Sequence, residues 1–150
     1  PAVFFTYAEV LFDFAEAAAR GFITSNAELI YRQAITASLN QFNITNVDSY
    51  LAQLSIAYNP SRWYESIGWQ KWIAYYGQGP DAFTDWRRLG YPILQSVPNS
   101  SLSSGSFPRR FFYPSTEQSL NGENYKVAVA DQGEDEITTR LWFDVENKKR

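Results

Sequence analysis

One stretch of the chain, residues 68–92, constrains the fold most strongly. Its sequence is GWQKWIAYYGQGPDAFTDWRRLGYP: an aromatic run, a glycine break, a proline-started run and a Gly-Tyr-Pro stop. A helix with so few polar positions is normally buried between other helices. Gly77 supplies the backbone conformation that ends the first helix, and Pro80 begins the second where its missing N–H costs nothing. The stretch therefore predicts two antiparallel helices, near residues 60–76 and 80–89.

The first two-fifths of the chain predicts another helical hairpin, with helices near residues 5–20 and 26–42. Apolar side chains at helical spacing form one stripe of the first helix: Tyr7, Leu11, Phe14 and Ala18. Charged side chains fill the opposite stripe: Glu9, Asp13, Glu16 and Arg20. We therefore expect a one-sided helix. Gly21 ends it, and Ser25 with Glu28 forms a capping box for the next helix.

Two hairpins in tandem, each of roughly the ~34-residue size of a tetratricopeptide unit, predict stacked helix pairs. The expected fold class is all-α, with tetratricopeptide-like helical hairpins and a long irregular C-terminal loop region. We divide this single domain into a first hairpin (1–42), a connector (43–60), a second hairpin (61–92) and a loop-rich segment (93–150). The connector is expected to hold one short helix near residues 47–54.

The segment after the second hairpin is rich in Pro, Ser, Gly and aromatic residues and shows no sustained period. We expect an ordered loop there, because its phenylalanines would be costly to leave in water. Residues 121–130 fit a short helix capped by Asn121, although residues 127–129 alone would equally allow a strand. Residues 138–144 alternate as an extended segment does. The charged tail from Glu146 is expected to be the true C-terminus.

Composition excludes several classes of protein. The 150 residues contain no Cys, Met or His, which removes thiolate and histidine metal sites and the usual catalytic triads. A net charge of −3 and a pI near 4.9 argue against a nucleic-acid partner, since phosphates require a basic surface. Apolar runs are too short to span a bilayer. Because the chain has no initiator Met, we expect a longer protein whose signal peptide or lipid anchor lies upstream.

Aromatic rings are the candidates for ligand contact, because their flat faces can stack on sugars. Tryptophans at helical spacing are usually core residues. We therefore predict that three of them are buried: Trp69, Trp72 and Trp86. Rings at the junction of the connector and the second hairpin are more easily exposed. The predicted ligand-binding residues come from this junction: Tyr58, Trp63 and Tyr64.

We assign structural roles, not catalytic ones, to three acidic side chains of the second hairpin. Glu65, Asp81 and Asp85 would suit a glycosidase only if two of them stood about 5–10 Å apart, which spacing in the sequence does not determine. Asp81 opposes the dipole at a helix start. We therefore predict no catalytic residue, and no cofactor is expected.

Two features of the C-terminal half involve charge. The acidic run 131–136 resembles a calcium loop but lacks the spacing of an EF-hand, and such runs are usually only solvated, so no metal site is predicted. The arginine pairs 87–88 and 109–110, together with Glu117, are predicted to form internal bidentate ion pairs that hold the long loop to the helices.

Five segments together carry a family signature. They are YAEVLFDFAEAAARG (7–21), YLAQLSIAYNPSRW (50–63), IGWQKWIAYYGQGPDAFTDWRRLGYP (67–92), PRRFFYPSTEQSLN (108–121) and TTRLWFDVE (138–146). In order and character they resemble the C-terminal part of SusD-like outer-membrane nutrient-binding lipoproteins. The pairing of a W-R-R-x-G-Y-P helix end with a later P-R-R-x-x-Y-P-x-x-E is specific. Departures are small: Phe143 stands where a second Trp is common, and Tyr75-Tyr76 where a bulky aliphatic residue is usual.

The resemblance implies a lipid-anchored helical scaffold on the surface of the outer membrane. Such proteins capture an oligosaccharide or a peptide and deliver it to a SusC-like TonB-dependent barrel transporter, without enzymatic activity. The half that supplies the anchor and much of the ligand face in relatives lies upstream of this chain. Two alternatives stay open: a tetratricopeptide-like adaptor that binds protein segments, and a carbohydrate-active enzyme. Because ligand choice resides in surface loops, the scaffold does not identify the ligand.

Overall fold

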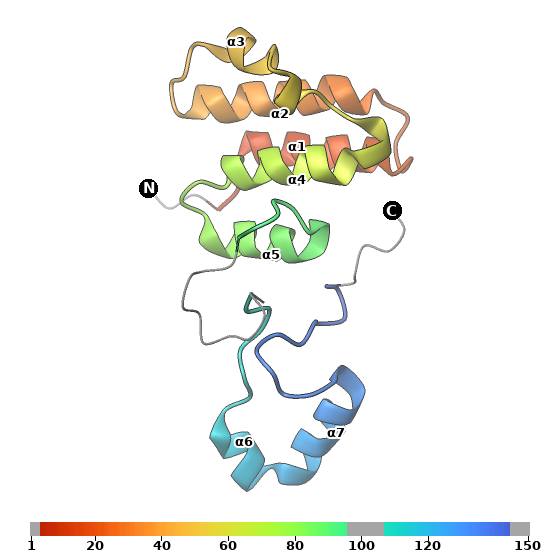
Figure 1. The fold of residues 1–150 in the computed structure, drawn as a ribbon, viewed down its shortest axis with the longest axis vertical. Coiled ribbons are helices and arrows are strands. Elements are labelled where there is room, and N and C mark those ends of the chain that lie inside the picture. Colours follow the sequence, from red (N-terminus) through yellow and green to blue (C-terminus); the bar gives the residue numbers. More distant parts are fainter. Residues whose placement is uncertain (1–3, 96–106, 145–150) are drawn as a thin grey trace. The chain divides into compact units, whose positions relative to one another are not determined.

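The computed structural model describes residues 4–95 and 107–144, and every regular element within these ranges is a helix (Figure 1). The all-α prediction is therefore confirmed. The chain divides into two compact units, one ending at Pro92 and one beginning at Ile93. Across the described ranges, no helix is both long enough and apolar enough to cross a membrane.

The first unit contains the four main helices that the sequence predicts. They are α1 (Tyr7–Ala19), α2 (Ala27–Gln41), α4 (Trp63–Ala74) and α5 (Gly79–Leu89). Three short pieces occupy the connector: α3 (Val47–Leu51), η1 (Leu54–Ile56) and η2 (Pro60–Arg62). Gly90 ends α5 in the left-handed conformation, with φ 77°, a value that glycine adopts without steric cost.

Side-chain caps fix the starts of α1 and α2. The Thr6 hydroxyl accepts a hydrogen bond from the Glu9 backbone N–H (3.1 Å), and the Glu9 carboxylate accepts one from the Thr6 N–H (3.5 Å). This is a capping box. α2 begins differently, because Asn26 is its N-cap and accepts from Leu29 N at 3.0 Å. The predicted capping box of Ser25 with Glu28 is therefore wrong: Asn26, one residue later, already satisfies the backbone donor.

The core of the first unit lies where α1, α2, α4 and α5 meet. α1 packs against α2 and α4, and α4 also packs against α2 and α5 (Figure 1). Large, fully buried side chains in this unit include Phe12, Tyr31, Ile35, Ile67 and Leu89. Each such burial contributes roughly 1.5–3 kcal/mol. Ala15 and Ala34 have no exposed surface, and their small size lets α1 and α2 approach closely.

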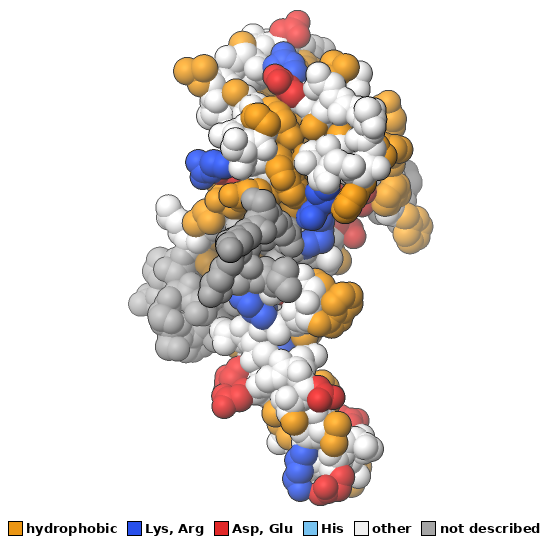
Figure 2. Space-filling model, turned by 90° about the vertical axis from the view of Figure 1, so that its right-hand side faces the viewer, with side chains coloured by type: hydrophobic (Ala, Val, Ile, Leu, Met, Phe, Trp, Pro, Cys, Tyr) orange, Lys and Arg blue, Asp and Glu red, His pale blue; other side chains and the backbone are white. Residues whose placement is uncertain are grey.

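Of the three tryptophans predicted to be buried, only some are. Trp86 is 6% exposed, as predicted, and Trp72 is half-buried. Trp69 is 43% exposed, so its assignment to the core is wrong. Neighbouring helices cover only part of α4 and leave Trp69 and Ile73 on a partly open side. Hydrophobic side chains reach the surface elsewhere too, as one face of the molecule shows (Figure 2).

The buried face of α1 also differs from the prediction. Tyr7 is 71% exposed and Phe14 50%, although both belong to the predicted apolar stripe. The buried residues of α1 are instead Ala8, Glu9, Phe12, Ala15 and Glu16. The core face thus includes part of the charged stripe, because basic and hydroxyl groups of α4 and α5 meet those acids.

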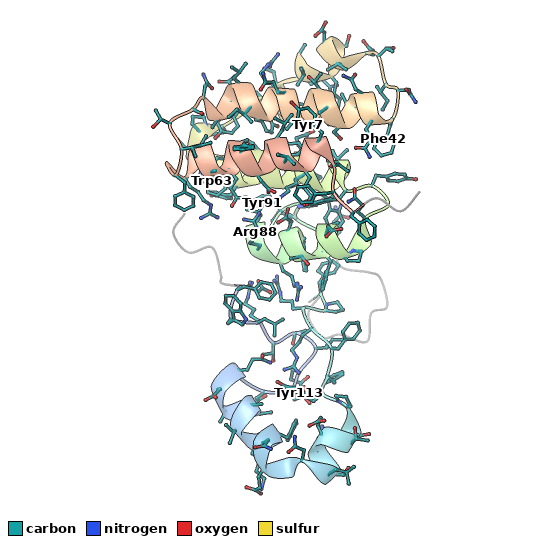
Figure 3. All side chains as sticks on the ribbon, turned by 180° about the vertical axis from the view of Figure 1, so that it is seen from behind. Tyr7, Phe42, Trp63, Arg88, Tyr91 and Tyr113 are labelled. Carbon is teal, nitrogen blue, oxygen red and sulfur yellow. The ribbon has the colours of Figure 1, made fainter. Side chains whose placement is uncertain are left out.

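One half of this charge network centres on Glu16. Arg88 of α5, labelled in Figure 3, places its guanidinium against the Glu16 carboxylate. Its Nη2 lies 2.7 Å from Oε2, and its Nη1 is bonded to Oε1. Arg20, the C-cap residue of α1, adds a second ion pair, with Nε 2.8 Å from Oε1. Arg88 also binds Asp85 at 2.8 Å. Glu16 therefore joins α1 to α5 through charge-assisted hydrogen bonds.

The other half centres on Lys71 of α4, whose residue surface is only 3% exposed. Its ammonium lies 2.6 Å from Asp13 of α1 and 2.6 Å from Asp85 of α5. One turn later, the Tyr75 hydroxyl donates to Glu9 Oε1 at 3.1 Å. A buried charge is tolerated only when it is paired and hydrogen-bonded. Lys71 thus fixes the relative positions of three helices.

The network lowers the pKa of Glu16 and raises the pKa of Lys71. Burial alone would raise the pKa of Glu16, but Arg88 and Arg20 outweigh it and hold that pKa below its ordinary value of 4.5. Burial alone would lower the pKa of Lys71, but Asp85 and Asp13 raise it above 10.5. Glu16 therefore stabilises the fold above about pH 4.5, and Lys71 does so below about pH 10.5.

We predict that Glu16→Gln lowers the free energy of unfolding of the intact protein by about 3 kcal/mol at neutral pH, because two arginines lose a buried partner. The difference from wild type should shrink as the pH falls through the folded-state pKa of Glu16, where the wild-type carboxylate itself becomes protonated. Denaturant titrations at neutral and acid pH measure both effects. Glu123→Gln, which removes an exposed ion pair with Lys126, is the control and should cost less than about 1 kcal/mol. A Glu16→Gln effect as small as the control contradicts the prediction.

A close backbone approach fixes α4 against the segment that follows α5. A Cβ added to Gly68 would lie 2.8 Å from the Cβ of Tyr91 and 3.6 Å from that of Leu89. The first distance is shorter than van der Waals contact, so an alanine would force the segment and the helix apart. Gly68 is therefore required by packing, since its φ lies outside the left-handed region.

Gly68→Ala is accordingly expected to lower the free energy of unfolding by about 1–3 kcal/mol, the usual cost of overpacking. Gly79→Ala is the matched control, because a Cβ at Gly79 meets no atom within 4 Å and φ there is not left-handed. That change should leave stability unaltered or raise it slightly. Denaturant unfolding of both variants provides the comparison, and equal stabilities would show that the contact with Tyr91 does not limit packing.

The second unit contains α6 (Ser115–Leu120) and α7 (Gly122–Gln132). α7 confirms the predicted helix and excludes the strand alternative, although Asn121 makes no side-chain cap bond. α6 was not predicted, because so short a helix shows no sustained period. Residues 138–144 contain turns rather than the predicted extended segment. The charged tail from Glu146 lies outside the described residues.

Two aspartates organise the second unit. The buried Asp144 carboxylate accepts from Arg109 Nη1 at 2.8 and 2.6 Å and from Arg140 Nη1 at 2.7 Å. Asp135 pairs with Arg110 at 2.8 Å and accepts from the backbone N–H of the neighbouring Tyr113 at 3.1 Å. Arg109 and Arg110 therefore form ion pairs, as predicted, but their acceptors lie after the end of α7 and not on a helix.

Glu117 is not one of the acceptors in these ion pairs, so that part of the prediction is wrong. Its carboxylate accepts from the Asn121 amide at 2.9 Å, one helical turn away. The acidic partners come instead from Asp135 and Asp144, which the sequence analysis did not pair with these arginines.

Candidate functional site

A pocket of about 450 Å³ opens beside α4 in the first unit. One part of its lining comes from η2 and α4: Arg62, Glu65, Ser66, Trp69, Gln70 and Ile73. The other part comes from α2, α3 and the connector: Tyr31, Tyr50, Ser55, Ile56, Ala57 and Asn59. We call this cavity the Trp69 pocket.

Helical spacing brings the α4 side of the pocket together. Arg62, Ser66, Trp69 and Ile73 are separated by four, three and four positions, which places them along one helix face. This face stays partly open, with Trp69 43% and Ile73 44% exposed. The result is an aromatic and aliphatic surface beside polar groups.

Hydrogen bonds hold the deeper parts of the pocket in place. The Tyr31 hydroxyl donates to the Ile56 carbonyl at 2.9 Å, which ties α2 to the connector. The Tyr50 hydroxyl donates to Gln70 Oε1 at 3.0 Å, which ties α3 to α4. Burial raises the pKa of Tyr31, so its hydroxyl stays a neutral donor. These bonds fix the lining without help from a ligand.

The charges at the mouth of the pocket balance one another. Arg62 forms an ion pair with Glu65 one helical turn away. A hydrogen bond with Tyr91 and the charge of Glu65 raise the pKa of Arg62, which stays a cation. The Ser66 hydroxyl accepts from the backbone N–H of Asn59 at 3.1 Å and closes the connector onto α4. The site therefore carries donors and acceptors without a strong net charge.

This arrangement suits a neutral ligand with both an apolar face and many hydroxyl groups. The Trp69 ring offers a flat apolar surface, and the amides and the ion pair at the mouth can donate and accept hydrogen bonds. Ligand pockets commonly combine apolar lining with a few such polar groups. A sugar unit has this chemistry, since its C–H face can lie on the ring while its hydroxyls reach the polar rim.

The three residues predicted to contact ligand occupy different environments. Tyr58 is half-buried, with its ring centroid 5.3 Å from that of Tyr31, and its neighbours in sequence line the pocket. Trp63 is only 8% exposed, so the expected exposure of its ring is wrong. The Arg20 guanidinium lies 4.8 Å from the ring centroid. Tyr64 is half-buried and packs on Tyr91.

Sequence reasoning missed Trp69 as a pocket residue. The aromatic run made most sides of α4 look buried, so Trp69 and Trp72 were both assigned to the core. The spacing of Trp69 from Arg62 and Ser66 was the available signal, because a face shared with a charged and a hydroxyl side chain is seldom fully buried.

A second cavity, of about 590 Å³, lies over the charge network of Glu16 and Lys71. The acids considered for catalysis fall here or at the Trp69 pocket: Asp85 is bound to Lys71 and Arg88, and Glu65 is bound to Arg62. The charges of Asp85 and Glu65 are thus engaged in structural pairs, whereas Asp81, at the start of α5, only lines the cavity. Within the described ranges, no group of acidic side chains has the arrangement to hold a metal ion, and in the run 131–136 Asp135 is bound to Arg110.

Comparison with known proteins finds one matching family and several similar solved structures. A family described as "starch-binding associating with outer membrane", SusD-like, matches residues 1–114. A solved SusD-like protein described as Bacteroidetes AC2a is 30% identical, with a TM-score of 0.87 over 97% of this chain and 31% of its own. No curated protein matches the chain.

Two further solved structures are described as chitin-binding. One is 31% identical, with a TM-score of 0.79 over 93% of this chain and 33% of its own. The other, a SusD homolog from Flavobacterium johnsoniae, is 26% identical, with a TM-score of 0.79 over 93% of this chain and 36% of its own. The chain therefore spans about a third of the length of these structures. Given the family match and the identity over nearly its whole length, the chain belongs to the SusD-like family.

Proposed function

We propose that the protein captures a glycan and that the Trp69 pocket is one of its contacts. The observation that supports this most is the half-exposed Trp69 ring beside amide, hydroxyl and paired charged groups in a pocket of about 450 Å³. The family description names starch, and two similar structures are described as chitin-binding. Oligomers of glucose or of N-acetylglucosamine are therefore the first ligands to test.

Family membership supports a proposal for the wider role. We infer that the intact protein is lipid-anchored at the surface of the outer membrane and delivers its ligand to a SusC-like TonB-dependent barrel transporter. Binding without turnover is supported by two of the three acids considered for catalysis, because Asp85 and Glu65 are held in ion pairs. A peptide ligand is the second candidate, favoured by a separate groove of about 530 Å³ beside α1 and α2 that Tyr7, Leu29 and Leu51 line.

The sequence prediction of ligand contacts at Tyr58, Trp63 and Tyr64 stays a proposal. Tyr58 is the best placed, because its ring packs on Tyr31, which lines the pocket. Because Trp63 is buried, we expect its replacement to lower the stability of the fold. Trp63→Ala should lower the free energy of unfolding by about 3–5 kcal/mol, as large-to-small changes in a core do.

We predict that Trp69→Ala weakens glycan binding while the protein stays folded. Loss of one aromatic anchor should cost roughly 1–3 kcal/mol of binding free energy, or about 5- to 150-fold in Kd. The change in stability should be small, because the ring is already half-exposed. Calorimetric titration of the intact protein with maltohexaose and with chitohexaose, together with thermal melting, measures both quantities.

Phe14→Ala is the matched control, because Phe14 is 50% exposed on α1 and does not line the pocket. It should bind either glycan as the wild type does. Wild-type affinity in folded Trp69→Ala would remove the pocket from the binding site. A wild-type protein that binds neither glycan but does bind peptides would favour the second candidate, and release of shorter sugars during the titration would indicate an enzyme.

A further inference from the structure

A different tryptophan, Trp142 in the second unit, is far more exposed than those of the first. Its residue surface is 86% exposed, and an aromatic side chain left in water forgoes the free energy of burial. It stands in a short turn that the Asp144 backbone N–H closes by donating to the Leu141 carbonyl at 2.8 Å. The ring is therefore presented by a defined piece of backbone.

The neighbours of Trp142 hold it and its polar surroundings in place. The Phe143 ring lies edge-on to it, with centroids 5.5 Å apart and an interplanar angle of 83°. Arg140 is bound to the buried Asp144 at 2.7 Å, and Asp144 is held in turn by Arg109. A binding site gains affinity when its groups are ordered before the ligand arrives.

Trp142 lines a pocket of about 420 Å³ together with the end of α7. The other lining residues are Asp131, Gln132, Arg140 and Leu141. In the described part of the chain, no hydrogen bond or ion pair engages the Asp131 carboxylate or the Gln132 amide. The exposed Trp142 ring therefore lies beside three polar groups: the Asp131 carboxylate, the Gln132 amide and the Arg140 guanidinium. Two of them are charged, one negatively and one positively.

We propose that this Trp142 pocket is a second glycan-binding site. A sugar unit would lie with its C–H face on the indole ring, its hydroxyls donating to Asp131 and Gln132 and accepting from Gln132 and Arg140. The opposite charges of Asp131 and Arg140 favour a neutral ligand over an ionic one. The choice of a glycan rests on the proposed function, whereas the site itself rests on the exposed ring and the unengaged polar groups.

Titration of the intact protein with chitohexaose and maltohexaose tests the site through two substitutions. Trp142→Ala should weaken binding of the preferred glycan by about tenfold or more, as loss of one aromatic anchor does. Trp142→Tyr, which keeps a ring, should retain most of the affinity. Phe111→Ala is the control, because Phe111 is 90% exposed in the same unit and does not line the pocket; it should bind as the wild type does.

Oxidation of tryptophan by N-bromosuccinimide, followed by peptide mass mapping, gives an independent readout in the wild-type protein. Trp142 should react readily in the free protein and be protected by the bound glycan. A Trp142 that is unreactive without ligand would mean that another part of the intact protein covers it, and this would overturn the proposal. Wild-type affinity in Trp142→Ala would overturn it as well. A wild-type protein that binds no glycan would instead contradict the proposed function, and with it the ligand class assigned here.

Discussion

The fold of the first unit depends on a buried charge network more than its aromatic composition suggests. Lys71 joins acids from two other helices, and Arg88 joins Glu16 to Asp85. Removing one member leaves a buried charge without its partner, which is far more costly than loss of an exposed pair. The network therefore determines which faces of α1, α4 and α5 point toward one another. The apolar side chains of the core pack on these same faces.

The rotation of α4 determines which of its aromatic rings meets solvent. Because Lys71 must point toward α1 and α5, Ile67 and Ala74 on nearby positions enter the core, and Trp69 turns to the partly open side. Tyr31 and Tyr50 then complete the Trp69 pocket through hydrogen bonds to the connector and to α4. The candidate binding surface is thus a consequence of how charges are buried elsewhere in the unit.

Much of the helical organisation follows from local chemistry that the sequence displays. Glycine and proline positions end and begin α4 and α5, so the predicted boundaries lie within a few residues of the observed ones. The buried faces were harder to predict, because helical spacing cannot tell an acidic stripe that faces water from one that meets Lys71 and Arg88. The positions of Trp63 and Trp69 were also predicted wrongly: Trp63 is buried although it lies at the connector junction, and Trp69 lines a pocket although it has helical spacing.

The most direct test of the account is a crystal structure of the intact protein with chitohexaose or maltohexaose bound. The account predicts a sugar unit lying on the Trp69 ring, with hydrogen bonds to the polar groups at the mouth of the pocket and the charge network unchanged. Sugar bound only at sites remote from both Trp69 and Trp142, with these rings buried by other parts of the protein, would contradict it.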